Sequence, residues 1–200
     1  MSDTSRRTAE QVLRTYFHAK DENRPHLMAT AFAETAILET VVKTGAISFP
    51  PVSRGLAPIT DVLVRKFAQT YENVYSFYLE RPRPTTPPDG FSCDWLVGMS
   101  ERESGKARVG CGRYDWRFQP EEPYLADRLV ITIEAMQVLS FELLDPILRW
   151  LAGLPYPWCP AETILATAPA RRGQTHFTPA QKALPCTRAT IRYIIAKVMR

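Results

Sequence analysis

The spacing of the apolar residues changes near residue 72, and this change constrains the fold more than any single motif. Before it, apart from a strand-like run at 36–44, apolar side chains recur at three- and four-residue spacing, as they do on amphipathic helices. After it, residues 74–80, 91–102, 107–119 and 129–139 form strand-length runs, the second and third joined by a hairpin turn at 103–106. Helices followed by a meander of strands predict an α+β fold.

Two helical segments open the chain. Thr8 and Gln11 have the spacing of a capping box, which predicts that the first helix begins at Thr8. Its stripe at helical spacing consists of Val12, Leu13, Tyr16, Phe17 and Lys20. A second, short helix is expected to start at residues 23–25, because proline is tolerated in a first helical turn. The two helices are expected to form a hairpin.

A strand, a loop and a third helix follow this hairpin. Residues 36–44 are rich in β-branched side chains and predict a strand. Residues 45–55 contain two consecutive prolines and indicate a loop. From Leu56 to about Tyr71 the apolar residues recur at spacings of 3, 4 and 7, which predicts a third amphipathic helix.

The length of 200 residues, 45% of them hydrophobic, is enough for one well-buried domain with an appendage. Asp145 and Pro146 can open one more helix, after which several prolines interrupt regular structure. We therefore expect a compact domain over residues 1–153. Residues 154–200 are expected to form a Pro/Ala-rich extension that ends in a basic amphipathic helix, which could dock on the body, on a partner or on an anionic membrane surface.

The formal net charge of +4 belongs to the tail and not to the body. After Glu162 the chain has seven basic residues and no acidic one, so the remainder carries a net charge of −3. Nucleic-acid binding needs a cationic face on the folded body, and the sequence offers none. We expect no nucleic-acid partner.

Compartment and metal content follow from what the sequence lacks. It has no apolar run of the roughly 20 residues that a membrane helix needs, and its N-terminus has no apolar signal segment. The four cysteines are widely spaced, without a CxxC pair or a nearby histidine cluster. These features predict a cytoplasmic protein without a membrane span, with reduced cysteines and without a zinc site.

Two segments resemble the nuclear transport factor two-like superfamily, which includes ketosteroid isomerases, scytalone dehydratase and SnoaL-like polyketide cyclases. They are AEQVLRTYFHAKDENRPHLMATAFAETAILET, similar to the opening helix pair and first strand, and RGLAPITDVLVRKF, similar to the approach to helix three. The resemblance covers residues 8–152. It implies a cone in which a curved antiparallel sheet wraps over three helices, with a deep pocket, and a homodimer formed through the sheets. The superfamily hosts enzymes, binding proteins and adaptors, so the fold leaves the function open.

Side-chain alternation along the strands then predicts which residues face the pocket. The expected pocket-lining residues are Thr40, Trp95, Val97, Met99, Trp116, Thr132 and Met136, with Tyr16, Tyr114 and Glu134 as polar groups. The alternate set on the last strand, with Leu129, Ile131, Ile133 and Ala135 facing inward, is equally apolar and would place Glu134 on the outer face.

Compared with ketosteroid isomerase, Tyr16 occupies the position of the tyrosine that stabilises an oxyanion. The other two catalytic positions differ, because Thr40 stands at the position of the base carboxylate and Tyr114 at that of the protonated acid. Glu39 is one residue from Thr40 and points to the opposite face. A buried Glu134 is left as the candidate general acid or base, so the candidate catalytic residues are Tyr16, Tyr114 and Glu134.

Three classes of function are compatible with these residues. The first is a lyase or isomerase that acts on a small hydrophobic carbonyl compound without metal or organic cofactor, and it predicts titratable groups clustered in the pocket. The second is a non-catalytic binder of a small hydrophobic molecule, and it predicts pocket polar groups that are already paired with one another. The third is a protein adaptor that uses the sheet face and the C-terminal helix.

Overall fold

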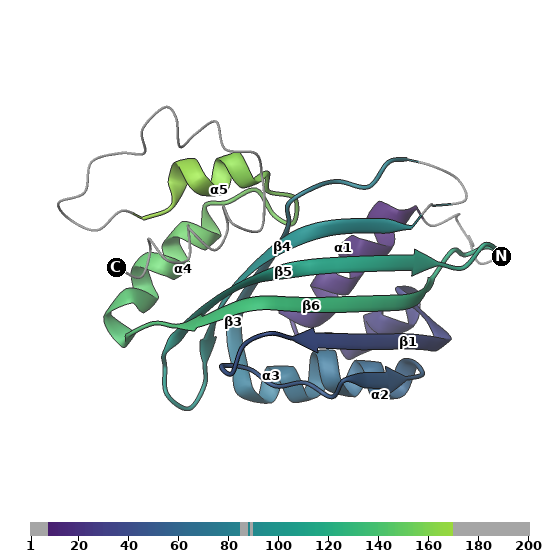
Figure 1. The fold of residues 1–200 in the computed structure, drawn as a ribbon, viewed down its shortest axis with the longest axis horizontal. Helices are drawn as coiled ribbons and strands as arrows, with labels where there is room; N and C mark the ends of the chain where they lie inside the picture. The colour runs from purple at the N-terminus through teal and green to yellow at the C-terminus, as the bar shows by residue number, and fades with distance from the viewer. Residues whose placement is uncertain (1–7, 85–87, 89, 170–200) are drawn as a thin grey trace.

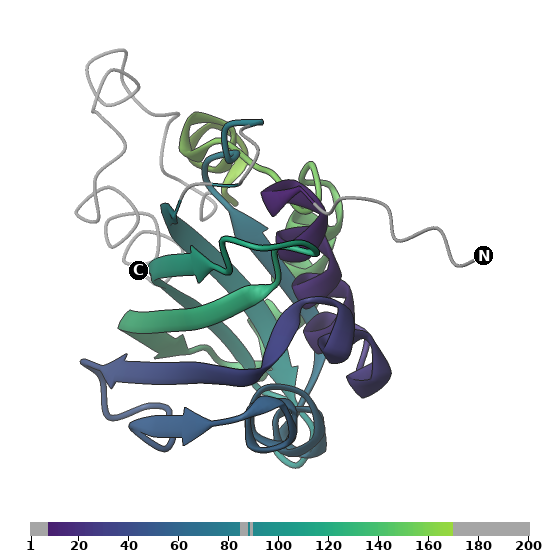
Figure 2. The same ribbon diagram turned by 90° about the vertical axis from the view of Figure 1, so that its right-hand side faces the viewer.

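A curved six-stranded sheet forms the centre of the molecule, described here by a computed structural model that covers residues 8–84, 88 and 90–169. The strands are β1 (Phe32–Val42), β2 (Val52–Arg54), β3 (Tyr71–Tyr78), β4 (Phe91–Glu101), β5 (Ala107–Phe118) and β6 (Ala126–Val138). Their order in the sheet is β2-β1-β6-β5-β4-β3, and every neighbouring pair is antiparallel except β1 with β6. Figures 1 and 2 show the sheet curving past the N-terminal helices. The predicted α+β fold is confirmed.

Helix α1 (Ala9–Asp21) packs its apolar stripe against the concave face of the sheet. The capping box is present, because the Gln11 amide donates to the Thr8 hydroxyl at 3.2 Å and the Thr8 amide donates to the Gln11 side chain at 2.8 Å. The predicted second helix is a single 3₁₀ segment, η1 (Pro25–Thr30), with its proline in the first turn. Both helix starts predicted from capping and proline position are confirmed.

The predicted third helix spans residues 56–70 as three consecutive segments, α2 (Leu56–Thr60), η2 (Asp61–Lys66) and α3 (Phe67–Thr70). The middle segment is a π-helix, in which each bond closes a wider turn than in an α-helix. Its buried Leu63, like Phe67 in the next turn, belongs to the concave-side core. Residues 56–70 are called the third helix below.

Strand β6 contains a β-bulge at Glu134. Cys111 of β5 pairs with Ala135, and the next residue, Gly112, pairs with Ile133, so Glu134 is the extra residue of the bulged strand. A bulge residue shifts side-chain alternation by one position. Ile133 and Met136, three residues apart, consequently face the same concave side.

The convex face of β3, β4 and β5 is covered by the chain that follows β6. A short 3₁₀ turn, η3 (Phe141–Leu143), leads into α4 (Leu144–Ala152), and α5 (Ala161–Thr167) lies beside it at one end of the sheet (Figure 1). Their buried side chains join those of the strands in a second core, called the convex-face core, formed by Phe77, Leu79, Leu96, Ala107, Val109, Cys111, Leu139, Ile147, Trp150, Leu151, Leu154, Cys159, Ala161, Ile164 and Leu165.

The compact body therefore continues past Gly153, where the prolines led us to end the domain. The Tyr78 amide donates to the Pro157 carbonyl at 2.8 Å, and the Cys159 amide donates to the Tyr78 carbonyl at 3.0 Å. The prolines after α4 end that helix, but the segment that follows it still packs against the body, because Trp158 and Cys159 are buried there. The basic helix expected near the C-terminus lies outside the described residues.

In the part of the chain that the structure describes, no helix is long and apolar enough to cross a membrane.

Candidate functional site

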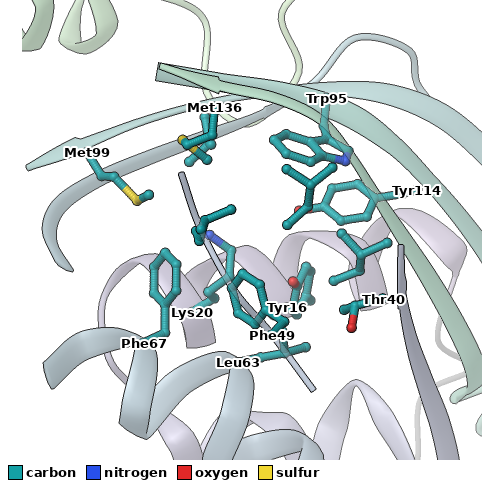
Figure 3. A pocket seen from close by; sticks show the side chains of 14 residues that line it. Tyr16, Lys20, Thr40, Phe49, Leu63, Phe67, Trp95, Met99, Tyr114 and Met136 are labelled. Atoms are coloured by element: carbon teal, nitrogen blue, oxygen red, sulfur yellow. The ribbon is translucent and has the colours of Figure 1, made fainter. Parts of the chain in front are cut away.

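A mostly apolar cavity lies between α1, the third helix, the 43–51 loop and the concave face of the sheet. It encloses about 480 Å³ of empty space, part of which is open to solvent. Figure 3 shows the side chains that converge on it. The lining residues are Tyr16, Lys20, Thr40, Ile47, Phe49, Leu63, Phe67, Trp95, Val97, Met99, Tyr114, Ile131, Ile133 and Met136. An apolar wall with a few polar groups is typical of small-molecule sites.

Most residues expected to face the cavity do line it. These are Tyr16, Thr40, Trp95, Val97, Met99, Tyr114 and Met136. Trp116, Thr132 and Glu134 are not among the lining residues. Alternation along β4 and β5 was therefore sufficient to assign the facing residues of those strands, with Trp116 as the exception.

On β6 the expected facing residues need correction. Ile131 and Ile133, two members of the alternate set, face the cavity in place of Thr132 and Glu134, whereas a third member, Ala135, packs against the convex-face core. We extended the alternation back from Met136 without interruption, and the bulge at Glu134 changes the phase at that point. The Glu134 side chain is only 4% exposed, and its Oε1 lies 2.9 Å from the Lys43 amine.

Trp116 is buried deeper in the cone and not at the cavity wall. Its ring packs against Tyr16 and Phe32, with centroid distances of 5.2 and 5.6 Å. It also stacks on Phe118. Trp116 therefore packs among aromatic rings behind Tyr16 and is not one of the residues that line the cavity.

Two glycines of β5 shape the sheet side of the cavity. A Cβ on Gly110 would stand 2.4 Å from the Met136 methyl group, and one on Gly112 would stand 2.6 Å from the Trp95 ring. The absent side chains are thus replaced by Met136 and Trp95, which lie flat over the strand. The cavity wall is formed by these two side chains.

Tyr16 and Tyr114 present their phenol groups on one side of the cavity. Both side chains are buried, and the two phenols lie close enough for each to affect the pKa of the other. Burial raises the pKa of Tyr16 and of Tyr114 far above the usual value for tyrosine, because the charged phenolate would be desolvated. Both are neutral hydrogen-bond donors near pH 7.

Lys20 is a polar lining residue that the sequence did not lead us to select. Its side chain is 7% exposed, and its amine points among the lining residues in Figure 3. The amine lies 5.0 Å from the centroid of the Phe67 ring. The available signal was its spacing, because Lys20 follows Tyr16 by four residues on the apolar stripe of the helix.

The Lys20 amine is held by a buried polar network. It donates to Asp21 Oδ1 at 2.5 Å and to Ser76 Oγ at 2.7 Å. The Asp21 carboxylate, itself 3% exposed, also accepts the Ser76 amide at 2.9 Å and the Tyr156 hydroxyl at 3.2 Å. A buried charge pair needs such additional hydrogen bonds to offset the desolvation of both ions. The network fixes the position of the amine at the cavity wall.

The 43–51 loop contributes Ile47 and Phe49 to the cavity, which its reading as a loop could not predict. Thr40 anchors its far end, because the Thr40 amide donates to the Pro51 carbonyl at 2.9 Å and the Thr40 hydroxyl donates to the Pro50 carbonyl. Its near end is anchored by the Lys43 amide, which donates to the Ile133 carbonyl at 2.9 Å. The Thr40 hydroxyl is therefore already occupied.

Glu39, beside Thr40 on β1, points away from the cavity and forms an ion pair with Arg128 at 2.9 Å. Among the described residues, no three or more histidine, cysteine, aspartate or glutamate side chains are grouped so that they could hold a metal ion.

Comparison with known proteins bears on the fold. No family model matches this sequence. No curated protein matches it by sequence either. Several solved structures match its shape at low sequence identity.

A nuclear transport factor 2-like superfamily protein from Salmonella enterica serovar Typhimurium is similar over 63% of this chain and 88% of its own, with a TM-score of 0.51 and 15% identity. LinA is similar over 64% of this chain and 85% of its own, with a TM-score of 0.52 and 10% identity. The hexachlorocyclohexane dehydrochlorinase LinA-type3 from Novosphingobium barchaimii is similar over 64% of this chain and 86% of its own, with a TM-score of 0.50 and 10% identity.

Identities of this size carry a fold and not an activity. The order of helices and strands, the curved sheet and these structural matches agree, and on that basis the chain has the fold of the nuclear transport factor 2-like superfamily.

Proposed function

We propose that this protein binds a small, mostly apolar molecule in the cavity between α1, the third helix and the sheet. The observation that carries this proposal is that the polar groups of the wall, except the Trp95 indole N–H, already have partners within the described part of the protein. Tyr16 interacts with Tyr114, Lys20 is bound to Asp21 and Ser76, and Thr40 donates to the 43–51 loop. Paired polar groups are what the binder class predicted.

A lyase or isomerase that uses acid/base chemistry receives less support from the cavity. Among the described residues that line it there is no carboxylate, histidine or cysteine. The phenols are neutral, because burial raises the pKa of Tyr16 and Tyr114, and a neutral phenol is a poor base. Glu134, the base that the sequence suggested, is paired with Lys43 and is not among the lining residues.

The apolar wall supports an aromatic or aliphatic ligand of modest size. Met99 and Met136 lie in the wall beside Trp95 and Val97, and methionine side chains adapt to ligands of different shape. Burial of an apolar molecule against these groups is favourable by roughly 25 cal/mol for each Å² removed from water. The donors in the wall would then set the orientation of the ligand.

Toluene is a suitable first probe, because it is apolar and small. In protein labelled with ¹³C at the methionine methyl groups, we expect toluene to shift the Met99 and Met136 signals through its ring current. The signal of Met28, which is fully buried outside the cavity lining, should not move.

A blocking variant and a matched control complete this test. Val97→Phe places a ring in the cavity and should abolish the response to toluene. Val41→Phe adds the same ring at an exposed position of β1 and should leave the response unchanged. Absence of shifts at Met99 and Met136 in the unmodified protein, or shifts that persist in Val97→Phe, would contradict the proposed function.

A further inference from the structure

The free hydrogen-bonding capacity of the cavity wall consists mainly of donors. A lysine amine has three N–H groups, and Lys20 directs two of them to Asp21 Oδ1 and Ser76 Oγ. The third has no acceptor among the described residues. The Trp95 indole N–H is buried and likewise has no partner within the described part of the chain. Both side chains line the cavity.

The phenol pair adds one more donor. Tyr16 and Tyr114 both line the cavity and each has one O–H; even a bond between the two hydroxyls would use only one of these hydrogens, so at least one remains. A buried donor without an acceptor destabilises the protein, so a ligand that supplies acceptor oxygen gains from several groups at once. The ligand should therefore carry an oxygen acceptor.

The charge of the site decides which kind of oxygen fits. The Lys20 ammonium is 2.5 Å from the Asp21 carboxylate, and both side chains are at least nine-tenths buried. The pair as a whole is neutral. A carboxylate in the cavity would lose its hydration, and its attraction to Lys20 would be reduced by repulsion from Asp21. An uncharged carbonyl oxygen loses less hydration and can accept the same hydrogen bonds.

We propose that the Lys20–Asp21 ion pair, whose net charge is zero, makes the cavity selective for small apolar molecules that carry an uncharged acceptor oxygen. Ketones and aldehydes should bind more tightly than carboxylates of the same size. This inference rests on the proposed binding function and names its ligand class. Lys20 is the donor that contacts the ligand. Asp21 is the residue that sets the charge preference without contacting it.

Acetophenone and benzoate test the preference directly, because they have the same number of non-hydrogen atoms and differ in a methyl group against a charged oxygen. Titration at pH 7, followed at the Met99 and Met136 methyl signals, should show acetophenone binding at least about tenfold tighter than benzoate, a difference that is well resolved in such titrations. This comparison needs no variant.

Asp21→Asn tests the role of the counter-charge. The asparagine keeps the shape and can still accept from the Ser76 amide, while the positive charge of Lys20 is no longer neutralised. We expect benzoate to gain at least about tenfold relative to acetophenone. The control is Asp61→Asn, which removes one negative charge from the ion pair between Asp61 and Lys66. The Asp61 side chain is 41% exposed and the Lys66 side chain 67% exposed, so this change should leave the ratio of benzoate to acetophenone affinity unchanged.

Lys20→Met tests the donor. Methionine keeps the length of the side chain without the N–H groups, so acetophenone binding should weaken several-fold while toluene binding is retained. The Met28 methyl signal reports whether each variant is folded.

The outcomes separate the two proposals. Toluene and acetophenone that both fail to bind the unmodified protein overturn the binding function together with this inference. If toluene binds but the affinity for benzoate equals or exceeds the affinity for acetophenone, the selectivity is overturned and the binding function stands. An Asp21→Asn protein that is folded and keeps the original ratio also overturns it, because the counter-charge would then have no effect.

Discussion

The two faces of one sheet are covered in different ways, and the cavity lies on the concave face. Alternate residues of β4 show the contrast, since Trp95, Val97 and Met99 line the cavity while Leu96 belongs to the convex-face core. On the convex face, a Cβ added to Gly98 would stand only 2.1 Å from Leu151, so α4 approaches the strand itself. On the concave face, the gaps above Gly110 and Gly112 are filled by the sheet's own Met136 and Trp95.

This difference explains where the ligand site can form. A helix closes onto a sheet where the strands are bare, as α4 does over Gly98. Where large side chains of the sheet already cover the strands, the helices are held further away. The 43–51 loop, with Ile47 and Phe49, then completes the wall. Four experiments test this contrast, in order of decreasing expected effect.

Removal of residues 154–200 should have the largest effect, because it strips the convex-face core. The shortened chain loses Cys159, Ala161, Ile164 and Leu165 and exposes the sheet residues beneath them. Deleting one large buried side chain costs about 2–5 kcal/mol, and whole domains are stable by only about 5–15 kcal/mol. We expect a chain that does not fold, measured by circular dichroism and urea unfolding. A chain shortened after Pro169 keeps α5 and should fold; a stable, monodisperse protein ending at Gly153 would show that the convex-face core is dispensable.

Gly112→Ala and Gly98→Ala compare the two faces by the same small change. At Gly112 the new Cβ would stand 1.9 Å from the Thr132 carbonyl oxygen of the neighbouring strand, and backbone cannot easily move. We expect a loss of about 3 kcal/mol or more in the free energy of unfolding. At Gly98 the obstacle is the Leu151 side chain, which can change its rotamer, so the loss should be about 1 kcal/mol. Urea titrations of both variants measure the difference, and a larger loss of stability for Gly98→Ala than for Gly112→Ala would contradict this expectation.

Alkaline pH should weaken the concave side through its buried tyrosines. Burial raises the pKa of Tyr16, Tyr78 and Tyr114 in the folded chain, while the unfolded chain titrates near the usual value of about 10. Above pH 10 the folded state holds more protons than the unfolded state, so stability is complete below pH 10 and falls as the pH rises further. Each such tyrosine contributes a slope of about 1.4 kcal/mol per pH unit.

Unfolding between pH 9 and 12, followed by circular dichroism together with tyrosinate absorbance, measures this effect. Tyr78→Phe should reduce the slope, although it also removes the hydrogen bond from the Tyr78 hydroxyl to the Leu13 carbonyl at 3.2 Å. On the convex face, burial raises the pKa of the Cys159 thiol to about 11. Cys159→Ala, which removes this titrating group, is therefore the convex-face counterpart of Tyr78→Phe. Tyrosinate that forms well before the structure is lost would contradict the prediction.

Glu134→Gln should have the smallest effect. Its partner Lys43 is 47% exposed, and ion pairs with one exposed partner contribute about 0–1 kcal/mol. We expect a loss of stability within that range and an unchanged affinity for toluene, measured in the methionine spectra. If the Glu134→Gln variant folds but no longer binds toluene, Glu134 contributes to the binding site and this prediction is wrong.

Sequence was a good guide wherever the signal was local. Thr8 and Gln11 located the start of α1, Pro25 located that of η1, and alternation assigned Trp95, Val97 and Met99 to the cavity. Each of these depends on spacing within a single element. The helical stripe and strand alternation, combined with the superfamily resemblance that related the helix to the sheet, also predicted that Tyr16 and Tyr114 face the cavity, and both line it.

The errors arose where contacts between distant segments decide the structure. The bulge at Glu134 is a property of the register between β5 and β6, and it could not be predicted from the residues of β6 alone. Lys20 was visible on the apolar stripe, but its partner Ser76 is 56 residues away in the sequence. Trp158 and Cys159 follow several prolines, so their burial against the sheet could not be predicted from local pattern.

The pairing of Tyr78 with Pro157 and Cys159 also determines how the sheet ends. Strand β3 is the last strand of the sheet on this side, and an open edge of this kind can recruit a strand from another molecule. Two of its amides are occupied by groups outside the sheet, since Tyr78 donates to the Pro157 carbonyl and Ser76 donates to the Asp21 carboxylate. The opposite edge, β2, has only three residues. Growth of the sheet by addition of strands, the first step of β-aggregation, is thus hindered at both edges, and at β3 the carboxylate that pairs with Lys20 at the cavity wall is one of the groups that protects the edge.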